Sequence, residues 1–143
     1  MKTKTFLVVC LFLGFGLTQS SAQSSSSWYV WDGYAINVYC GGVLVDNLVG
    51  ETNVHEILHF NNQDIWVWGR QQYHGELTSV NTGEGFTVND EYIYYPATWL
   101  GEGHCNIIGD AGSHYILTYT YNAANWDDPD YGLTIVTANC IGQ

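Results

Sequence analysis

Basic residues are scarce in this sequence. Its 143 residues include only three Lys or Arg against fourteen Asp or Glu, a formal net charge of −11. Lys2 and Lys4 stand at the N-terminus, so Arg70 is the one strong base in the rest of the chain. Phosphate backbones and anionic membrane surfaces repel a chain this acidic. We therefore expect neither a nucleic-acid partner nor a membrane partner.

Several familiar signatures are also missing. No G-x-x-x-x-G-K-[ST] or G-x-G-x-x-G segment follows a strand and opens a helix, so nothing predicts a phosphate-binding loop. No G-x-S-x-G elbow anchors a serine nucleophile. Neither a repeat of fixed period nor a linker divides the chain. The sequence therefore predicts a single domain.

The N-terminus lacks an apolar run long enough to span a bilayer, which requires roughly 20 residues. Basic residues precede a short apolar stretch over 6–17, and Ser20-Ser21-Ala22 supplies the small residues of a cleavage site. This pattern predicts a signal peptide over 1–22 and a secreted or periplasmic protein. We expect a flexible leader over 23–27 and one β domain over 28–143.

Cysteine is sparse too, with four in the chain, of which Cys10 lies in the expected signal peptide. In an oxidising compartment the remaining three predict one disulfide and one free thiol. Cys40 ends the first strand-like run and Cys140 ends the last, so we expect them to pair. Cys105 is then either buried and inert or a cross-link to another chain.

The pattern along the chain is that of β-strands. Gly41-Gly42 is typical of a two-residue hairpin, and Asn61 to Asp64 and Asp110 to Gly112 read as turns. Short runs rich in β-branched and aromatic residues recur between glycines. This spacing predicts an all-β fold of about 8–10 short strands, an antiparallel sandwich or a small barrel with little or no helix.

One catalytic motif is present. His55-Glu56-Ile57-Leu58-His59 spells H-E-x-x-H, which on a helix places two histidines on one zinc with the glutamate as general base. On a strand, His55 and His59 would lie roughly 13 Å apart, with Glu56 on the opposite face. Strand-like neighbours and the lack of a third ligand at a recognisable spacing favour the strand. A minimal zinc metallopeptidase is therefore the alternative function, not the preferred one.

A second set of metal ligands lies in an acidic loop. Asp127, Asp128 and Asp130 are oxygen ligands of the kind that Ca²⁺ takes. They lack the spacing of a calcium loop, and a solvated turn bent by Pro129 explains them as well. We accordingly predict no cofactor, with zinc or calcium as the alternatives.

Aromatic residues are abundant, with six Trp and eleven Tyr. These side chains stack on flat ligands while donating a hydrogen bond, although most of them are expected in the core. We predict a non-catalytic domain that binds a neutral glycan or a small stacking ligand through Trp99, Trp126 and Tyr131. A further alternative is an assembly subunit that joins its neighbours through edge strands or Cys105.

Overall fold

The computed structural model describes residues 22–122, 124 and 134–142. These residues form one antiparallel sheet of seven strands, which lie side by side in the order of the chain. The strands are β1 (Gln23–Cys40), β2 (Val43–Phe60), β3 (Trp66–Ser79), β4 (Gly85–Tyr95), β5 (Leu100–Gly109), β6 (His114–Asn122) and β7 (Thr134–Ile141). The prediction of an all-β, antiparallel fold is confirmed, and no helix occurs in the part of the chain that is described.

Two details of the prediction were wrong. The expected flexible leader, residues 23–27, is the start of β1 and pairs with residues 56–60 of β2. Some strands are also longer than expected, since β1 and β2 each run for 18 residues. Glycines inside the strands had suggested breaks that do not exist. The expected signal peptide lies outside the described residues except for Ala22.

The first two strands form a hairpin that bends sharply halfway along. Gly41 and Gly42 both have positive φ, 60° and 82°, which is the backbone of the predicted two-residue turn. The bend follows an irregular pairing between Trp31 and Tyr34 in β1. Next to it, a Cβ on Gly50 would lie 2.2 Å from the Glu76 carbonyl oxygen. Only glycine permits this close crossing, which turns the hairpin across the sheet.

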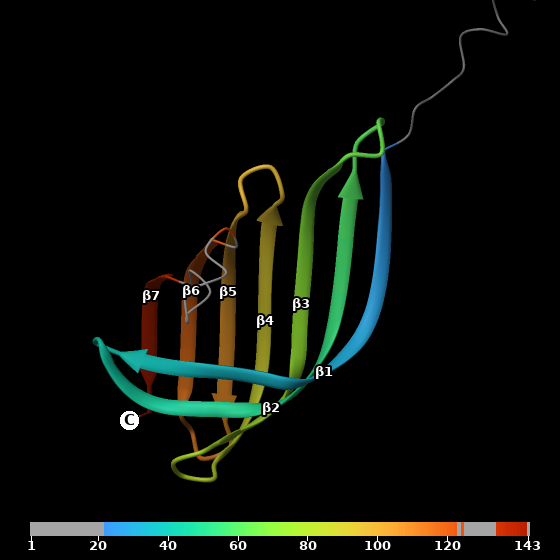
Figure 1. Cartoon of the computed structure of the whole chain (residues 1–143). Helices are drawn as coiled ribbons and strands as arrows, with labels where there is room; N and C mark the ends of the chain where they lie inside the picture. The colour runs from blue at the N-terminus through green and yellow to red at the C-terminus, as the bar shows by residue number, and fades with distance from the viewer. Residues whose placement is uncertain (1–21, 123, 125–133, 143) are drawn as a thin grey trace, which may run out of the picture.

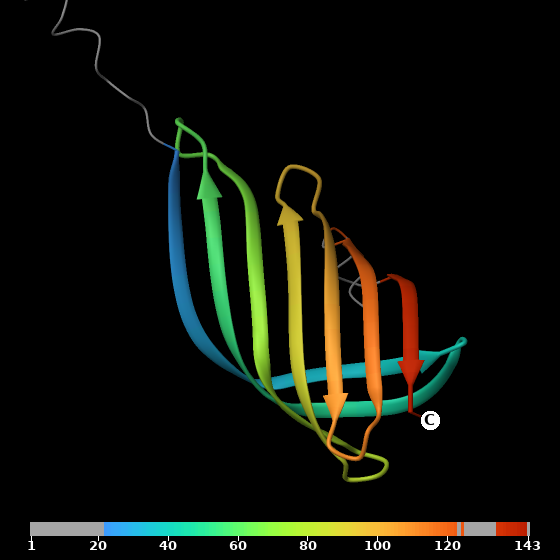
Figure 2. The same ribbon diagram turned by 180° about the vertical axis from the view of Figure 1, so that it is seen from behind.

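Beyond the bend the hairpin covers one face of the sheet, as both views show (Figures 1 and 2). Val38 of β1 and Leu48 of β2 pack there against Phe86, Ile107 and Leu117 of the strands beneath. These side chains are almost fully buried. We call this two-layered region the closed end, and burying each large apolar side chain there contributes roughly 1.5–3 kcal/mol.

A disulfide joins two strands covalently at the closed end. Cys40 at the end of β1 is bonded to Cys140 in β7, with their Cα atoms 6.1 Å apart, which confirms the predicted pair. The bond joins the first and last strands of the sheet across 100 residues of sequence. In the described residues there is no helix long and apolar enough to cross a membrane.

Candidate functional site

Before the bend, the sheet is a single layer, and we call this region the open end. Its inner face, the one over which the hairpin folds, is lined by aromatic side chains from β1, β3, β4 and β6. They are Tyr29, Trp31, Tyr34, Trp66, Tyr73, Tyr92, Tyr94, Tyr119 and Tyr121. Antiparallel pairing places them there, because directly opposed residues share a face.

The rings form a continuous chain of contacts. Trp66 meets Tyr94 edge to face at 5.3 Å between centroids, and Tyr94 lies 5.5 Å from Tyr92. Tyr92 stacks on Tyr73 at 5.9 Å, and Tyr73 lies 5.4 Å from Tyr34. Aromatic pairs in these geometries attract each other beyond their burial. Together they make a firm aromatic floor that runs from the open margin to the closed end.

Glycines opposite the tyrosines make room for this floor. Gly69 is paired with Tyr94, and a Cβ there would lie 2.3 Å from the tyrosine ring. Gly103 is in the same relation to Tyr119, at 2.2 Å. Each ring therefore lies flat over the backbone of the neighbouring strand. Any larger residue at either glycine would push the ring out of place.

Gln71 is the polar centre of the inner face. Its amide oxygen accepts hydrogen bonds from the Tyr73 hydroxyl, at 2.5 Å, and from the Tyr92 hydroxyl. Its amide nitrogen donates to Glu56 Oε1 at 2.5 Å, and the Tyr94 hydroxyl donates to the same oxygen at 3.2 Å. This network orients Glu56, which is partly exposed, toward the space above the rings.

Asp90 is a second carboxylate on this face, but it is buried. Its two oxygens accept hydrogen bonds from the hydroxyls of Tyr34 and Tyr119, each 2.8 Å long. Burial raises the pKa of the Asp90 carboxyl, while the bonds from Tyr119 and Tyr34 act to lower it. With both oxygens occupied, Asp90 fixes the junction between the aromatic floor and the apolar core.

The phenols of this face are donors at neutral pH. Burial raises the pKa of Tyr92 to about 12. It also raises the pKa of Tyr94, and the nearby Glu56 carboxylate adds to that shift. A protonated phenol keeps its hydrogen-bond donor. The phenols of the inner face thus keep the protons that they donate to Gln71, Glu56 and Asp90, and these polar groups lie between the aromatic rings.

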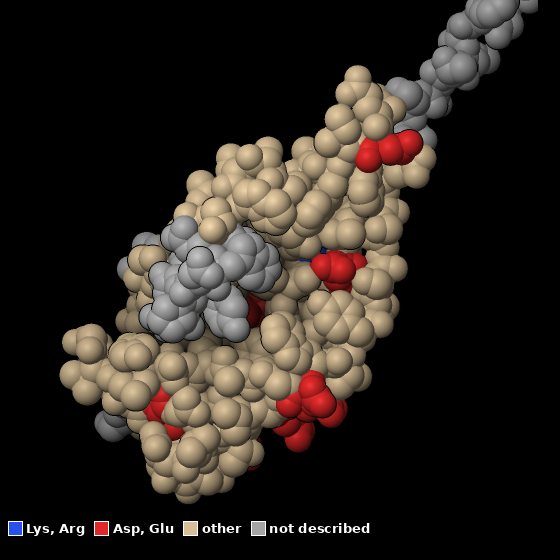
Figure 3. All heavy atoms as spheres, in the orientation of Figure 1, with Lys and Arg blue, Asp and Glu red and all other residues tan. Residues whose placement is uncertain are grey.

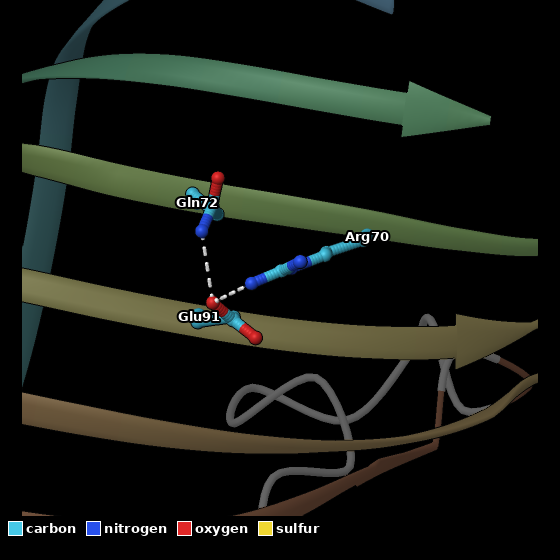
Figure 4. Close-up of polar contacts among 3 residues, drawn as sticks. All are labelled: Arg70, Gln72 and Glu91. Atoms are coloured by element: carbon cyan, nitrogen blue, oxygen red, sulfur yellow. Dashed lines mark hydrogen bonds and ion pairs between the residues drawn. The ribbon is translucent and has the colours of Figure 1, made fainter. Parts of the chain in front are cut away.

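The charge on this face is negative. Figure 3 views the molecule from this side and shows scattered carboxylates with very little basic surface. Arg70 donates to Glu91 at 2.5 Å, and Gln72 donates to the same carboxylate oxygen at 2.9 Å (Figure 4). The Arg70 bond is the main reason that the pKa of Glu91 is lowered. Arg70, Gln72 and Glu91 alternate along their strands with inward-pointing residues, so they lie on the outer face. Arg70, the one strong base in the described residues, is therefore paired with a carboxylate on that outer face.

The H-E-x-x-H segment lies within β2, so the zinc-peptidase geometry does not form. His55 and His59 point to the outer face, and Glu56 to the inner. His55 Nε2 lies 2.8 Å from Ser26 Oγ, and its ring stacks on Trp28 at 4.0 Å. His59 Nδ1 lies 3.1 Å from Ser24 Oγ. Across the described residues, no three His, Cys, Asp or Glu side chains gather to hold a metal.

A shallow depression of about 500 Å³ lies at the turn between β2 and β3. It is lined by Ala22, His59, Asn61, Asn62, Gln63, Val67 and Trp68. His59 stacks on Trp68 there at 5.1 Å. The depression is open to solvent and lacks the fixed hydroxyl network of the inner face.

Of the predicted ligand residues, Trp99 falls within the described part of the chain. Trp99 lies in the turn after β4, 46% exposed and with a positive φ of 57°. It makes none of the ring contacts found among the described residues. Trp126, Tyr131 and the acidic residues Asp127, Asp128 and Asp130 lie outside those residues, so their predicted roles remain predictions.

Cys105 is fully buried in the apolar core. Burial and the nearby Asp90 carboxylate raise the pKa of its thiol well above the usual value, which opposes thiolate formation. Of the two predicted alternatives for Cys105, the buried thiol is confirmed, and this burial disfavours a cross-link to another chain.

Comparison of the chain with protein-family models, with curated proteins and with solved structures gives no match in any of the three. The local geometry is therefore the only basis for a functional proposal.

Sequence reasoning missed the inner face. Two signals for it were present: the period-two run Asp90, Tyr92, Tyr94, and the similar pair Gln71, Tyr73. Period two places each run on one face of its strand. What the sequence did not supply was the register that puts Gln71 opposite Tyr92.

Proposed function

We propose that this protein is an exported, non-catalytic binding domain that holds a neutral glycan on the inner face of its open end. The observation that carries the proposal is the continuous aromatic floor with Glu56 and Gln71 fixed among its rings. Aromatic rings stack on the apolar faces of sugars, and the polar groups between them fix the orientation.

The hydrogen bonds within the site support binding with little reorganisation. Gln71 holds the phenols of Tyr73 and Tyr92, and Glu56 is held by Gln71 and Tyr94. A site whose side chains are already ordered loses less conformational entropy when it takes up a ligand. Glu56 Oε2 is left to accept a sugar hydroxyl.

Charge supports a neutral ligand. Acidic side chains on this face would repel sulfated or carboxylated glycans. The hydroxyl groups of an uncharged sugar can donate to Glu56 and to the phenol oxygens, whose own protons are already donated to Gln71 and Glu56. A non-catalytic role is favoured because glycoside hydrolysis requires two working carboxyl groups, and Asp90 has both of its oxygens bonded to phenols.

An extracellular location is part of the proposal. The Cys40–Cys140 disulfide is typical of oxidising compartments. The expected signal peptide would carry the chain to such a compartment.

The test is an array of neutral and anionic oligosaccharides, followed by calorimetry on the best neutral ligand. Trp66→Ala should weaken that binding about fivefold, since stacking on one ring is worth roughly 1 kcal/mol. The matched control is Trp28→Ala on the outer face, where the ring is 71% exposed and no loss is expected. Failure to bind any neutral glycan, or equal loss in both variants, would refute the proposal.

A further inference from the structure

The first part of β1, residues 23–31, lies at an edge of the sheet formed by the described residues. On one side it pairs residue by residue with residues 52–60 of β2. On the other side the described residues supply no strand, because β1 is the first strand of the sheet. Figures 1 and 2 show this part of β1, in blue, at the outer margin of the sheet. Its outward backbone N–H and C=O groups are ready to pair with another strand.

This edge lacks the features that normally protect one. Residues 23–31 contain no charged residue and no proline, and their pairing with β2 is regular up to Trp31. Exposed edges are usually blocked by charges, prolines or bulges. Instead, the last four residues of the segment are large and apolar, with Trp28 71%, Tyr29 40%, Val30 57% and Trp31 45% exposed.

The opposite margin of the sheet differs. β7 is bonded through Cys140 to Cys40, and the second part of β1 touches it there. The closed end therefore brings the two outer strands together, while none of the described strands covers the outer edge of the first part of β1.

We infer that the first part of β1 pairs with the same segment of a second copy of this chain, as antiparallel strands around a two-fold axis. Such an axis stands perpendicular to the sheet and joins the two sheets into one. This inference is independent of glycan binding.

The sequence of the segment matches this arrangement. Small or polar residues fill its first half, Gln23 to Ser27, and bulky ones its second half, Trp28 to Trp31. Two-fold pairing centred on Ser27 sets Ser26 opposite Trp28 and Ser25 opposite Tyr29. The same register sets Ser24 opposite Val30 and Gln23 opposite Trp31. Each bulky side chain then faces a small or polar one, and each strand supplies both halves.

Charge favours the same contact. A chain of net charge −11 repels its own copies over most of its surface. Residues 23–31 are uncharged, so two copies meet there without placing carboxylates against each other. Interfaces with two-fold symmetry are the commonest in homo-oligomers.

Sedimentation of the full chain over a range of concentrations tests the pairing. We expect a concentration-dependent dimer, which Val30→Glu shifts to monomer by placing two new carboxylates at the interface. The matched control is Val49→Glu on β2, where Val49 is 41% exposed but lies between β1 and β3. A wild type that is monomeric throughout, or equal dissociation of both variants, would overturn the inference.

Cross-linking tests the register and remains informative if Val30→Glu fails to fold. Ser27→Cys places two thiols next to each other at the two-fold axis, so a covalent dimer should appear on a non-reducing gel. Ser24→Cys places its thiol opposite Val30, roughly 20 Å along the strand from the partner's thiol, at about 3.3 Å per residue. Equal cross-linking of both variants, or no cross-linking of Ser27→Cys, would contradict the pairing.

Discussion

The closed end and the open end are built from the same strands, yet they differ in what holds them together. At the closed end the bent hairpin adds a second layer, and apolar side chains such as Leu48 and Leu117 are almost fully buried. At the open end the inner face is aromatic and polar, and hydrogen bonds through Gln71 order it. We therefore expect the closed end to contribute most of the stability, and we propose the open end as the binding surface.

The boundary between the two ends is a bend in two strands. Gly50 and the irregular pairing after Trp31 turn the hairpin over the sheet. Without that turn, Val38 and Leu48 would not cover the apolar face of β4 to β6. The contrast between the ends therefore depends on a few backbone positions, and three experiments test it in order of expected effect.

The largest effect is expected from replacing both Cys40 and Cys140 by serine. A bond that closes 100 residues of sequence restricts the unfolded chain strongly, so its loss should lower the free energy of unfolding by about 4 kcal/mol. Urea unfolding measures the total loss in the free energy of unfolding, and hydrogen exchange shows which residues lose protection. Faster exchange should be concentrated in residues 34–50. Uniform acceleration across both ends would show that they are not separate in stability.

A smaller effect is expected from Leu117→Ala in the closed end. Leu117 is 1% exposed, and removing its side chain leaves a cavity, at a cost of about 3 kcal/mol. Trp66→Ala is the matched change at the open end and should cost only about 1 kcal/mol, because Trp66 is partly exposed. Chemical denaturation of both variants tests the difference. Comparable losses would remove the distinction between a stabilising end and a binding end.

The smallest effect concerns Asp90, at the junction of the two ends. Burial raises the pKa of this carboxyl in the folded state, so its ionisation opposes folding. Its contribution to stability is full below its unfolded pKa of about 3.9 and is lost as the pH rises through the folded pKa. Asp90→Asn should therefore gain stability relative to the wild type as the pH rises from 4 to 7.

Glu91→Gln is the control, because the pH dependence of stability expected from Glu91 has the opposite sign to that from Asp90. The Arg70 guanidinium lowers the pKa of Glu91, so the stability from this carboxylate is present at neutral pH and is lost as the pH falls. Urea unfolding at pH 4, 5.5 and 7 separates the two variants. Parallel pH profiles for Asp90→Asn and the wild type would contradict the role given to burial.

Local features of the fold were predictable from the sequence. Gly41-Gly42 carries its own turn geometry, and Cys40 and Cys140 mark the first and last strands, so the hairpin and the disulfide were both predicted correctly. Strand lengths were not, because Gly50, Gly69 and Gly75 resemble breaks. The role of each glycine depends on which backbone or side chain of a neighbouring strand lies against it, and the sequence alone does not show this.

The candidate site was less predictable for the same reason. Its members come from β1 to β6, and their meeting depends on five separate pairing registers. A shift of one residue in any of these would turn a strand's aromatic side chains to the other face. Trp99 was predicted to bind the ligand because it is an aromatic residue near a loop. Tyr73 and Tyr92 appeared to be ordinary strand residues.

The disulfide also determines what happens to the protein when a protease cleaves its backbone once. Most turns of the sheet lie between Cys40 and Cys140, including those around Gly83, Pro96 and Gly112. A single cut in any of these turns leaves the two fragments covalently joined through the first and last strands. The antiparallel pairing on either side of the cut then keeps the new ends in place. In an extracellular medium that contains proteases, the molecule would survive a nick as one folded unit.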